Sequence, residues 1–264
     1  QSVFYILPEL ILSLSIMSLL MIGVFVKRSF KLVNLLTILV LFFLIAVVLN
    51  QPDEVIKIFK GSYIIDKFSI IMKVLTFMFC IFILLSTQDY LKNNDIDKIE
   101  YPIIILSSVL GMIIMISSYD LIVFYLGLEL QSLCLYILAS FNKNDEKSTE
   151  AGLKYFILSA LATGLLLYGS SLIYGFTGST NFEIISQQLN ANNTAAVFGI
   201  VFVTVGLAFK VSAVPFHMWT PDVYEGAPTS ITSYFAVVPK VAGLAVLIKF
   251  MHIPFSNILL EWQT

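Results

Sequence analysis

The sequence predicts an all-α fold, a polytopic membrane bundle of about eight transmembrane helices. Its 264 residues are 58% hydrophobic and only 12% charged, whereas soluble domains are typically about 45–50% apolar and about 25% charged. A soluble chain of this length could not bury so much apolar surface. Composition therefore argues against a soluble enzyme, a nucleic-acid-binding protein and a disordered chain. The net charge of −2 gives no reason to expect a polyanionic partner.

The expected spans are runs of roughly 20 mostly apolar residues, the length that crosses a bilayer as a helix. A tight turn at residues 119–120 separates the fourth span from the fifth. The spans are Val3–Val26, Leu32–Leu49, Phe68–Thr87, Pro102–Ser118, Leu121–Phe141, Gly152–Phe176, Ala195–Phe216 and Ser230–Met251.

Basic residues in alternate loops predict the orientation. One face of the membrane is expected to hold Lys57, Lys60 and Lys67, and the next two loops on that face contain no Lys or Arg. The opposite face is expected to hold the larger set of basic residues. The positive-inside rule then places the N-terminus outside. It also makes 181–193 an external polar loop and 217–229 an internal one. The basic residues expected inside are Lys27, Arg28, Lys31, Lys92, Lys98, Lys143 and Lys147.

The cysteines and histidines predict neither a metal centre nor a disulfide framework. Cys80 and Cys134 lie in apolar runs and are expected to be small buried hydrophobes. No CxxC pair or Cys/His ligand spacing is present. His217 and His252 stand at the ends of apolar runs.

Ionisable residues inside the spans are the candidate functional residues, because each costs about 2.5–3.5 kcal/mol at a helix centre. Glu129 lies near the middle of the fifth span, Lys240 near the middle of the eighth, and Lys210 well inside the seventh. A structural ion pair that locks the helices is the alternative for these three. Lys154 follows Glu150 by one turn near an inner boundary, so an ordinary surface pair is equally compatible with that position.

The remaining charges have simpler interpretations. Lys249, near the end of the eighth span, is expected to be an interface anchor. Lys73, near the start of the third span, is compatible with an anchoring or a functional role. Asp222 and Glu225 are expected to be solvated or helix-terminal charges in the inner loop.

Two prolines accompany the buried lysines. Pro215 follows Lys210 by five residues, and Pro239 immediately precedes Lys240. A proline inside a helix frees the carbonyl four residues earlier. In a bilayer, irregular backbone is tolerated where it lines a cavity, so two lysines beside broken helices predict a transport site at the midplane. Kinks that only shape helix packing are the alternative.

Proton exchange is the chemistry that this arrangement allows. Burial disfavours the charged form of a lysine, and a nearby carboxylate favours it. We expect Glu129 to be the partner of Lys210 and Lys240 to accept its proton. His217, two turns after Lys210 on a straight helix, could pass protons at physiological pH. Capping of a helix next to a polar loop is the alternative for this histidine.

One segment carries a resemblance to a known family. The stretch Gly206–Pro228, with the sequence GLAFKVSAVPFHMWTPDVYEGAP, resembles the signature of antiporter-like membrane subunits of respiratory complex I. The superfamily also includes subunits of Mrp-type sodium/proton antiporters and of energy-converting hydrogenases. Four further segments resemble the subunit N family of bacterial NADH–quinone oxidoreductase, the counterpart of mitochondrial subunit 2. They are Leu7–Glu9, Leu128–Ser132, Glu150–Phe156 and Val238–Lys240.

The resemblance implies specific roles and partners. Glu129 matches a glutamate that pairs with the lysine of the broken seventh helix, here Lys210, and Lys240 matches a bridging lysine. Lys154 and His217 match further proton-transfer positions, and Glu150 a peripheral acidic one. Protons would move along these residues in response to quinone reduction elsewhere in the complex. This chain would hold no cofactor and no metal, because NADH, quinone, FMN and iron–sulfur clusters belong to other subunits.

The family also implies a domain plan and a location. Residues 1–100 would form an N-terminal three-helix region, residues 101–252 the first of two inverted five-helix repeats, and residues 253–264 the start of a truncated remainder. The chain is therefore expected to be a fragment. Its partners would be the lipid bilayer and other complex I membrane subunits, with no nucleic acid. It would lie in a bacterial inner membrane, or alternatively the mitochondrial one. A sodium/proton antiporter subunit and a structural membrane scaffold are the rival functions.

Overall fold

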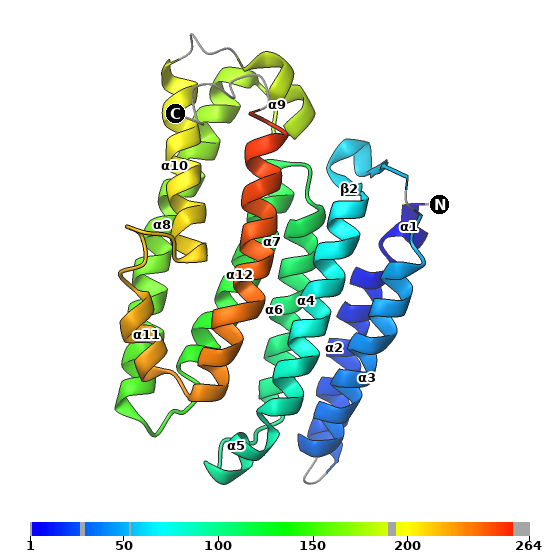
Figure 1. Ribbon diagram of the computed structural model, residues 1–264, viewed down its shortest axis with the longest axis vertical. Helices are drawn as coiled ribbons and strands as arrows, with labels where there is room; N and C mark the ends of the chain where they lie inside the picture. The colour runs from blue at the N-terminus through cyan, green and yellow to red at the C-terminus, as the bar shows by residue number, and fades with distance from the viewer. Residues whose placement is uncertain (1, 27–29, 53, 190–193, 256–264) are drawn as a thin grey trace.

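The computed structural model describes residues 2–26, 30–52, 54–189 and 194–255, and nearly all of its regular structure is helical. Long helices run up and down side by side, and short ones cover the ends (Figure 1). The helices are α1 (Ser2–Tyr5), α2 (Leu7–Phe25), α3 (Phe30–Leu49), α4 (Lys67–Ser86), α5 (Gln88–Asn93), α6 (Glu100–Ser117), α7 (Leu121–Ala139), α8 (Glu146–Thr177), α9 (Phe182–Gln188), α10 (Thr194–Val211), α11 (Thr220–Gly226) and α12 (Thr229–His252).

Seven of these helices are long and apolar enough to cross a membrane, namely α2, α3, α4, α6, α7, α8 and α12. Helix α10 corresponds to the predicted seventh span, and its apolar stretch 197–211 is shorter. The predicted membrane bundle is confirmed. The first span begins at Leu7 rather than Val3, because α1 and α2 are separate helices. Helix α8 begins at Glu146 rather than Gly152, because Asp145 caps it by accepting a hydrogen bond from the backbone N–H of Lys147.

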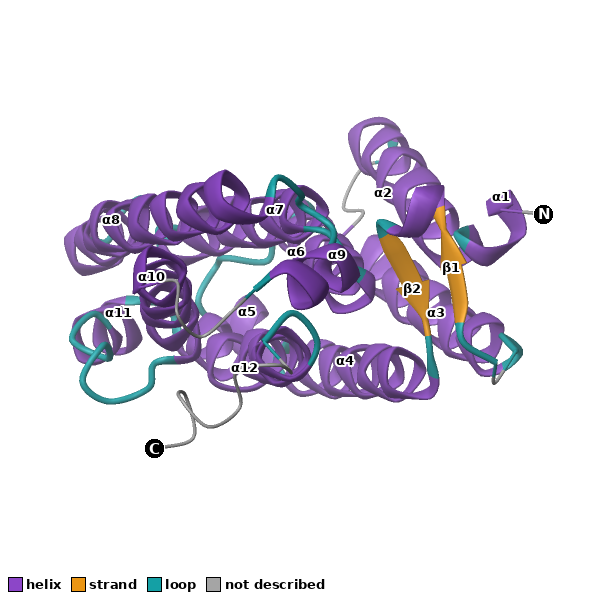
Figure 2. Ribbon diagram, turned by 90° about the horizontal axis from the view of Figure 1, so that it is seen from above, coloured by secondary structure: helices purple, strands orange, loops and turns teal. Residues whose placement is uncertain are grey.

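A small β-hairpin marks one end of the bundle. Strand β1 (Ile56–Ile58) pairs antiparallel with β2 (Tyr63–Ile65), and the short 3₁₀ helix η1 (Phe59–Gly61) joins them. Figure 2 shows the two strands at the end of the bundle where α9 also lies. We call this the hairpin end. In the described parts of the polar loops predicted at 181–193 and 217–229 lie two short helices, α9 and α11.

The opposite end, which we call the α11 end, holds α5, α11 and the beginning of α8 (Figure 1). Lys31, Lys92 and Lys98 lie together there around one hollow, and Lys147 pairs with Glu225 of α11 at 3.6 Å. The predicted gathering on one side is thus confirmed for Lys31, Lys92, Lys98 and Lys147, whereas Lys27 and Arg28 lie outside the described residues.

Two glycines bring α6 and α7 into very close contact. A Cβ atom on Gly111 would lie 2.6 Å from the backbone nitrogen of Gln131, and one on Gly127 would lie 2.8 Å from that of Met115. Small residues let membrane helices approach this closely. The pair makes α6 and α7 a rigid centre, with α4, α8 and α12 packed around it.

Both cysteines are buried and free, as predicted for small buried hydrophobes.

Candidate functional site

Helix α10 ends inside the bundle. Ser212 follows its last residue with a left-handed φ of 61°. Its backbone N–H donates to the carbonyl of Phe209 at 3.1 Å, and that of Ala213 donates to Ala208 at 2.9 Å. These two bonds close a helix end of the Schellman type. The predicted break is confirmed, but it comes before Pro215. The expectation that the span runs to residue 216 with Pro215 inside it is therefore wrong.

Lys210, in the last turn of α10, is held by hydroxyl groups. Its Nζ donates to Ser159 Oγ at 2.6 Å, to Ser132 Oγ at 2.8 Å and to Tyr136 Oη at 3.4 Å. Ser132 and Tyr136 stand one turn apart on α7, and Ser159 comes from α8. Three neutral acceptors from two neighbouring helices therefore surround the ammonium group.

Glu129 is not a direct partner of Lys210, contrary to the expected ion pair. One of its carboxylate oxygens, Oε1, is buried and accepts no hydrogen bond. The carboxylate interacts with the Lys210 ammonium only through electrostatics. Ser132, three residues further along α7, supplies the oxygen that the lysine reaches. The two charges are neighbours without touching.

Lys240, in the middle of α12, is bound to the end of α10. Its Nζ donates to the backbone carbonyl of Lys210 at 3.2 Å and also to the Ser212 hydroxyl. It lies 4.7 Å from the centre of the Trp219 ring, in cation–π range. The end of one helix thus supplies a carbonyl and a hydroxyl to the lysine of another, and the two lysines become neighbours.

Pro239 does not break α12. The helix runs continuously from Thr229 to His252 with this proline inside it. The prediction of two broken helices is therefore right for α10 and wrong for α12. Other helices pack on both sides of α12, and these contacts stabilise a helix that a proline alone would destabilise.

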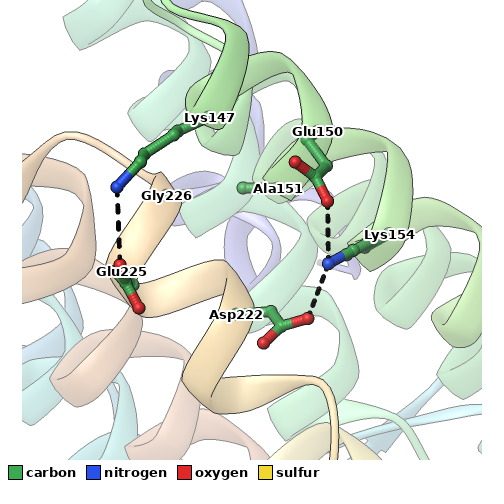
Figure 3. Close-up of a pocket in the computed structure, with 7 residues that line it drawn as sticks. All are labelled: Lys147, Glu150, Ala151, Lys154, Asp222, Glu225 and Gly226. Atoms are coloured by element: carbon green, nitrogen blue, oxygen red, sulfur yellow. Dashed lines mark hydrogen bonds and ion pairs between the residues drawn. The ribbon is translucent and has the colours of Figure 1, made fainter.

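A cluster of charges lies between α8 and α11. Lys154 donates to Asp222 Oδ2 at 2.7 Å and pairs with Glu150 Oε1 at 2.9 Å. Figure 3 shows both carboxylates turned toward this ammonium, with the pair between Lys147 and Glu225 beside them. The cluster lines a hollow of about 160 Å³. Asp222 lies in the first turn of α11 with an exposed side chain, as predicted for a solvated or helix-terminal charge. Its contact with Lys154 joins residues 68 positions apart.

Aromatic rings fill the space between this cluster and the central lysines. Tyr155, next to Lys154 in the chain, stacks on Trp219 with ring centres 4.4 Å apart and an interplanar angle of 6°. It also meets Tyr136 edge-on at 5.0 Å. Tyr136 in turn donates to Ser159 Oγ at 2.6 Å. The charged cluster and the lysine cluster are therefore contiguous.

His217 stands apart from these groups. It is exposed in the segment between α10 and α11, and its backbone carbonyl accepts from the N–H of Thr220 at 2.9 Å. A shared helical face with Lys210 is excluded, because α10 ends at Val211. The structure therefore brings together Lys210 and Lys240, and separately Lys154 and Glu150, but does not place His217 against either pair.

Comparison with known proteins identifies the fold. A family model described as NADH:quinone oxidoreductase/Mrp antiporter, TM, matches residues 118–263, which is more than half of the chain. The chain belongs to this NADH:quinone oxidoreductase/Mrp antiporter family. NADH-quinone oxidoreductase subunit N of Pelagibacter ubique is 56% identical to it over 260 residues, covering 98% of this chain and 55% of the relative. The chain therefore spans about half the length of the curated relatives it matches.

Solved structures of the antiporter family agree. A chain of respiratory complex I from Thermus thermophilus superposes with a TM-score of 0.80 at 29% identity, covering 94% of this chain and 54% of that chain. A chain of an Mrp complex from a Dietzia species superposes with a TM-score of 0.79 at 19% identity, covering 94% and 49%. The second likeness concerns the fold alone. The predicted antiporter-like membrane fold is confirmed.

The sequence pattern alone does not predict the hydroxyl groups that hold Lys210 and Lys240. Ser132, Tyr136, Ser159 and Ser212 were not singled out, although Ser132 and Tyr136 share a face of α7 with Glu129. Such a row of polar side chains on one face of an apolar helix is the signal that could have found the first two. Ser212 carries no comparable signal before the end of α10 is known.

Two further lysines lie in the interior of the bundle. Lys73 is 1% exposed and forms an ion pair with Glu9 at 2.7 Å. It also donates to the Tyr63 hydroxyl at 2.9 Å. Lys249 is 5% exposed and donates to the carbonyl of Ile116 at 3.0 Å, so the interpretation as an interface anchor is wrong. Both lysines lie in the interior because helices from distant parts of the sequence supply their partners.

In the described residues, no three His, Cys, Asp or Glu side chains lie close enough together to hold a metal ion.

Proposed function

We propose that this chain is part of a proton-translocating membrane subunit, the subunit N of an NADH–quinone oxidoreductase. The proposal is supported by a curated relative of that name with 56% identity and by the fold of a respiratory complex I chain at 29% identity. Protons would move along Lys154, Lys210 and Lys240, with Glu129 and Glu150 as the acidic groups that set their charge.

The observation that carries this proposal is the contact between the two central lysines. Lys240 donates to the carbonyl of Lys210 itself, while Lys210 donates to three hydroxyls. Neither ammonium makes a direct ion pair with a carboxylate among the described residues. A lysine held by neutral oxygens loses its proton at a smaller electrostatic cost than one in an ion pair. Two such lysines in succession form a route for a proton.

Electrostatics can drive the transfer. Like charges on neighbouring lysines disfavour one another in a low-dielectric interior, so a proton arriving at Lys210 favours release from Lys240. Glu129 interacts electrostatically with the Lys210 ammonium without a direct contact. The buried, unpaired oxygen of Glu129 leaves this carboxylate free to follow a change of charge elsewhere.

Proton entry would occur at the α11 end. Lys154 lies there between Glu150 and Asp222, next to a polar hollow, and exposed His217 would deliver protons from solvent. By the positive-inside rule, the basic side chains gathered at this end would lie inside and the N-terminus outside. The membrane would be a bacterial inner membrane, since the relatives are bacterial proteins; the mitochondrial inner membrane is the alternative.

The remaining parts of the machine would lie in other subunits. Those subunits would bind NADH, quinone, FMN and iron–sulfur clusters, and this chain would contact neighbouring membrane subunits and lipid. Residues 1–100 would form its three-helix region and residues 101–252 the first inverted repeat. Its own residues would orient and transfer protons only.

The test is substitution of Lys240 in the full-length protein within its native complex. Lys240→Met removes the exchangeable proton but keeps much of the side-chain volume. We expect the complex to assemble while proton translocation falls by roughly 10²-fold, the lower part of the range that a positioned acid or base contributes. Translocation would be measured in inverted membrane vesicles by quenching of a pH-sensitive dye, alongside NADH oxidation.

Three results would contradict the proposal. Normal NADH oxidation together with normal translocation in Lys240→Met vesicles removes the proton route. If less complex assembles but each assembled complex translocates protons normally, the alternative of a structural membrane scaffold is favoured. Translocation that requires sodium, shown by replacing sodium with choline, favours the antiporter.

A further inference from the structure

Helix α12 carries a second lysine, which is fully buried, on the face opposite the partly buried Lys240. Lys249 lies nine residues further along, which is about two and a half helical turns. Lys240 accordingly faces α10 and the Trp219 ring, whereas Lys249 faces the end of α6. The functional route proposed above uses Lys240 and leaves Lys249 without a role.

The two lysines are held by the same construction. Lys240 donates to the carbonyl of residue 210, in the last turn of α10. Lys249 donates to the carbonyl of Ile116, in the last turn of α6, at 3.0 Å. The last four carbonyls of a helix lack helical partners and form the negative end of its dipole. In both places a helix end, rather than a bonded carboxylate, stabilises the ammonium group.

Asp66 connects Lys249 to the surface. Its Oδ1 lies 4.0 Å from Lys249 Nζ, too far for a direct hydrogen bond. The Asp66 side chain is 23% exposed, whereas that of Lys249 is 4% exposed. The carboxylate also caps α4 by accepting the N–H of Ser69 at 2.9 Å. An acidic group on a rigid helix start therefore stands between the buried lysine and the hairpin end.

A fixed positive charge adjoins this pair. Lys73 is bound to Glu9 and to the Tyr63 hydroxyl, so its charge is locked in place by the direct ion pair. Lys73 and Lys249 interact electrostatically. Glu9, Tyr63 and Lys73 thus form a separate set of contacts beside Lys249 and take no part in the transfer.

We propose that Lys249 and Asp66 form a proton-exchange site that opens the bundle toward its hairpin end. In the transfer one N–H bond of the Lys249 ammonium breaks and one O–H bond forms on Asp66, leaving a neutral amine and a neutral acid. At 4.0 Å, one bridging water or a small approach of the carboxylate carries the proton. Asp66 then releases it to solvent, and the amine is reprotonated from the bundle interior.

This inference rests on the proposed function, because it gives the proposed proton route an opening at the hairpin end of the bundle. Its site is separate from the contacts of Lys210 and Lys240, so the two ideas fail in different experiments.

The test uses three variants of the full-length protein in its complex. Lys249→Arg keeps the charge and the reach but does not release a proton. Lys249→Met removes the charge. Asp66→Asn removes the acid while retaining a good helix N-cap, so α4 should start unchanged. Lys57→Met, an exposed lysine at the same end, is the matched control and should translocate normally.

We expect both Lys249 variants to reduce proton translocation by roughly 10²-fold and Asp66→Asn to reduce it to a smaller extent. If Lys249→Arg translocates normally, the lysine has only a positioning role and the inference is overturned. If neither Lys249 variant assembles, Asp66→Asn decides: reduced translocation supports the site and normal translocation overturns it. The Lys240→Met variant distinguishes failure of this inference from failure of the proposed function. Normal translocation in that variant would contradict the proposed function itself.

Discussion

Lys73 and Lys240 are both lysines within membrane-spanning helices, yet their surroundings are opposite. Lys73 forms an ion pair with Glu9 and donates to Tyr63. Lys240 has a backbone carbonyl, a serine hydroxyl and the face of an indole ring. Lys73 is fully buried and Lys240 is partly buried, so a position inside an apolar helix alone does not mark a functional lysine. The group bonded to the ammonium, a carboxylate or a neutral oxygen, decides whether the lysine keeps its proton or can exchange it.

The difference follows from electrostatics at low dielectric. A carboxylate in direct contact strongly stabilises the protonated lysine, and removal of either partner leaves an uncompensated charge in the interior. Carbonyl and hydroxyl dipoles stabilise the ammonium less, and they remain satisfactory partners for a neutral amine. We call the ion pair between Lys73 and Glu9 the lock, and the proposed proton route through Lys210 and Lys240 the relay.

The largest expected effect breaks the lock. Lys73→Met leaves Glu9 buried without its cation and should destabilise the folded chain by about 3–5 kcal/mol. We expect little complex in the membrane, measured by immunoblot of the full-length protein. The double variant Glu9→Gln/Lys73→Met removes both charges and should restore assembly. Failure of the double variant to assemble would show that the lock needs its charges for more than mutual compensation.

A smaller effect sharpens the relay side of the comparison. Lys210→Arg keeps a positive charge near Glu129, but a guanidinium does not release its proton and is larger than the space among three hydroxyls. The complex should assemble, and proton translocation should fall by roughly 10²-fold. Dye quenching in vesicles measures this directly. Unchanged translocation would assign Lys210 to the same locked class as Lys73.

The smallest effect concerns an ion pair outside the membrane interior. Lys57 and Glu183 pair at the hairpin end with both side chains more than a third exposed, and the bond to Glu183 raises the pKa of Lys57 above its ordinary 10.5. Glu183→Gln should cost less than about 1 kcal/mol. The stabilisation is present below pH 10.5 and is lost as pH rises through the raised pKa.

The melting temperature of the purified complex should therefore differ slightly between wild type and Glu183→Gln at neutral pH and converge in strong alkali. A difference as large as that of Lys73→Met would show that exposure does not weaken this pair, and would remove the distinction between buried and exposed partners.

The sequence by itself determined the membrane bundle, most of its spans and the side on which basic residues gather. It also singled out Glu129, Lys210 and Lys240, because a charge inside a long apolar run is costly wherever its partner lies. These properties are local: hydropathy, run length and charge can each be counted along the chain.

Only the tertiary structure decided the partners. Ser132 and Ser159 reach Lys210 across 78 and 51 positions of sequence, and Ile116 reaches Lys249 across 133. The exact end of α10 depends on backbone hydrogen bonds around Ser212 rather than on Pro215. Whether a lysine is locked, as Lys73 is, or exchangeable depends on which atoms packing places beside it, and packing brings together residues that no local pattern connects.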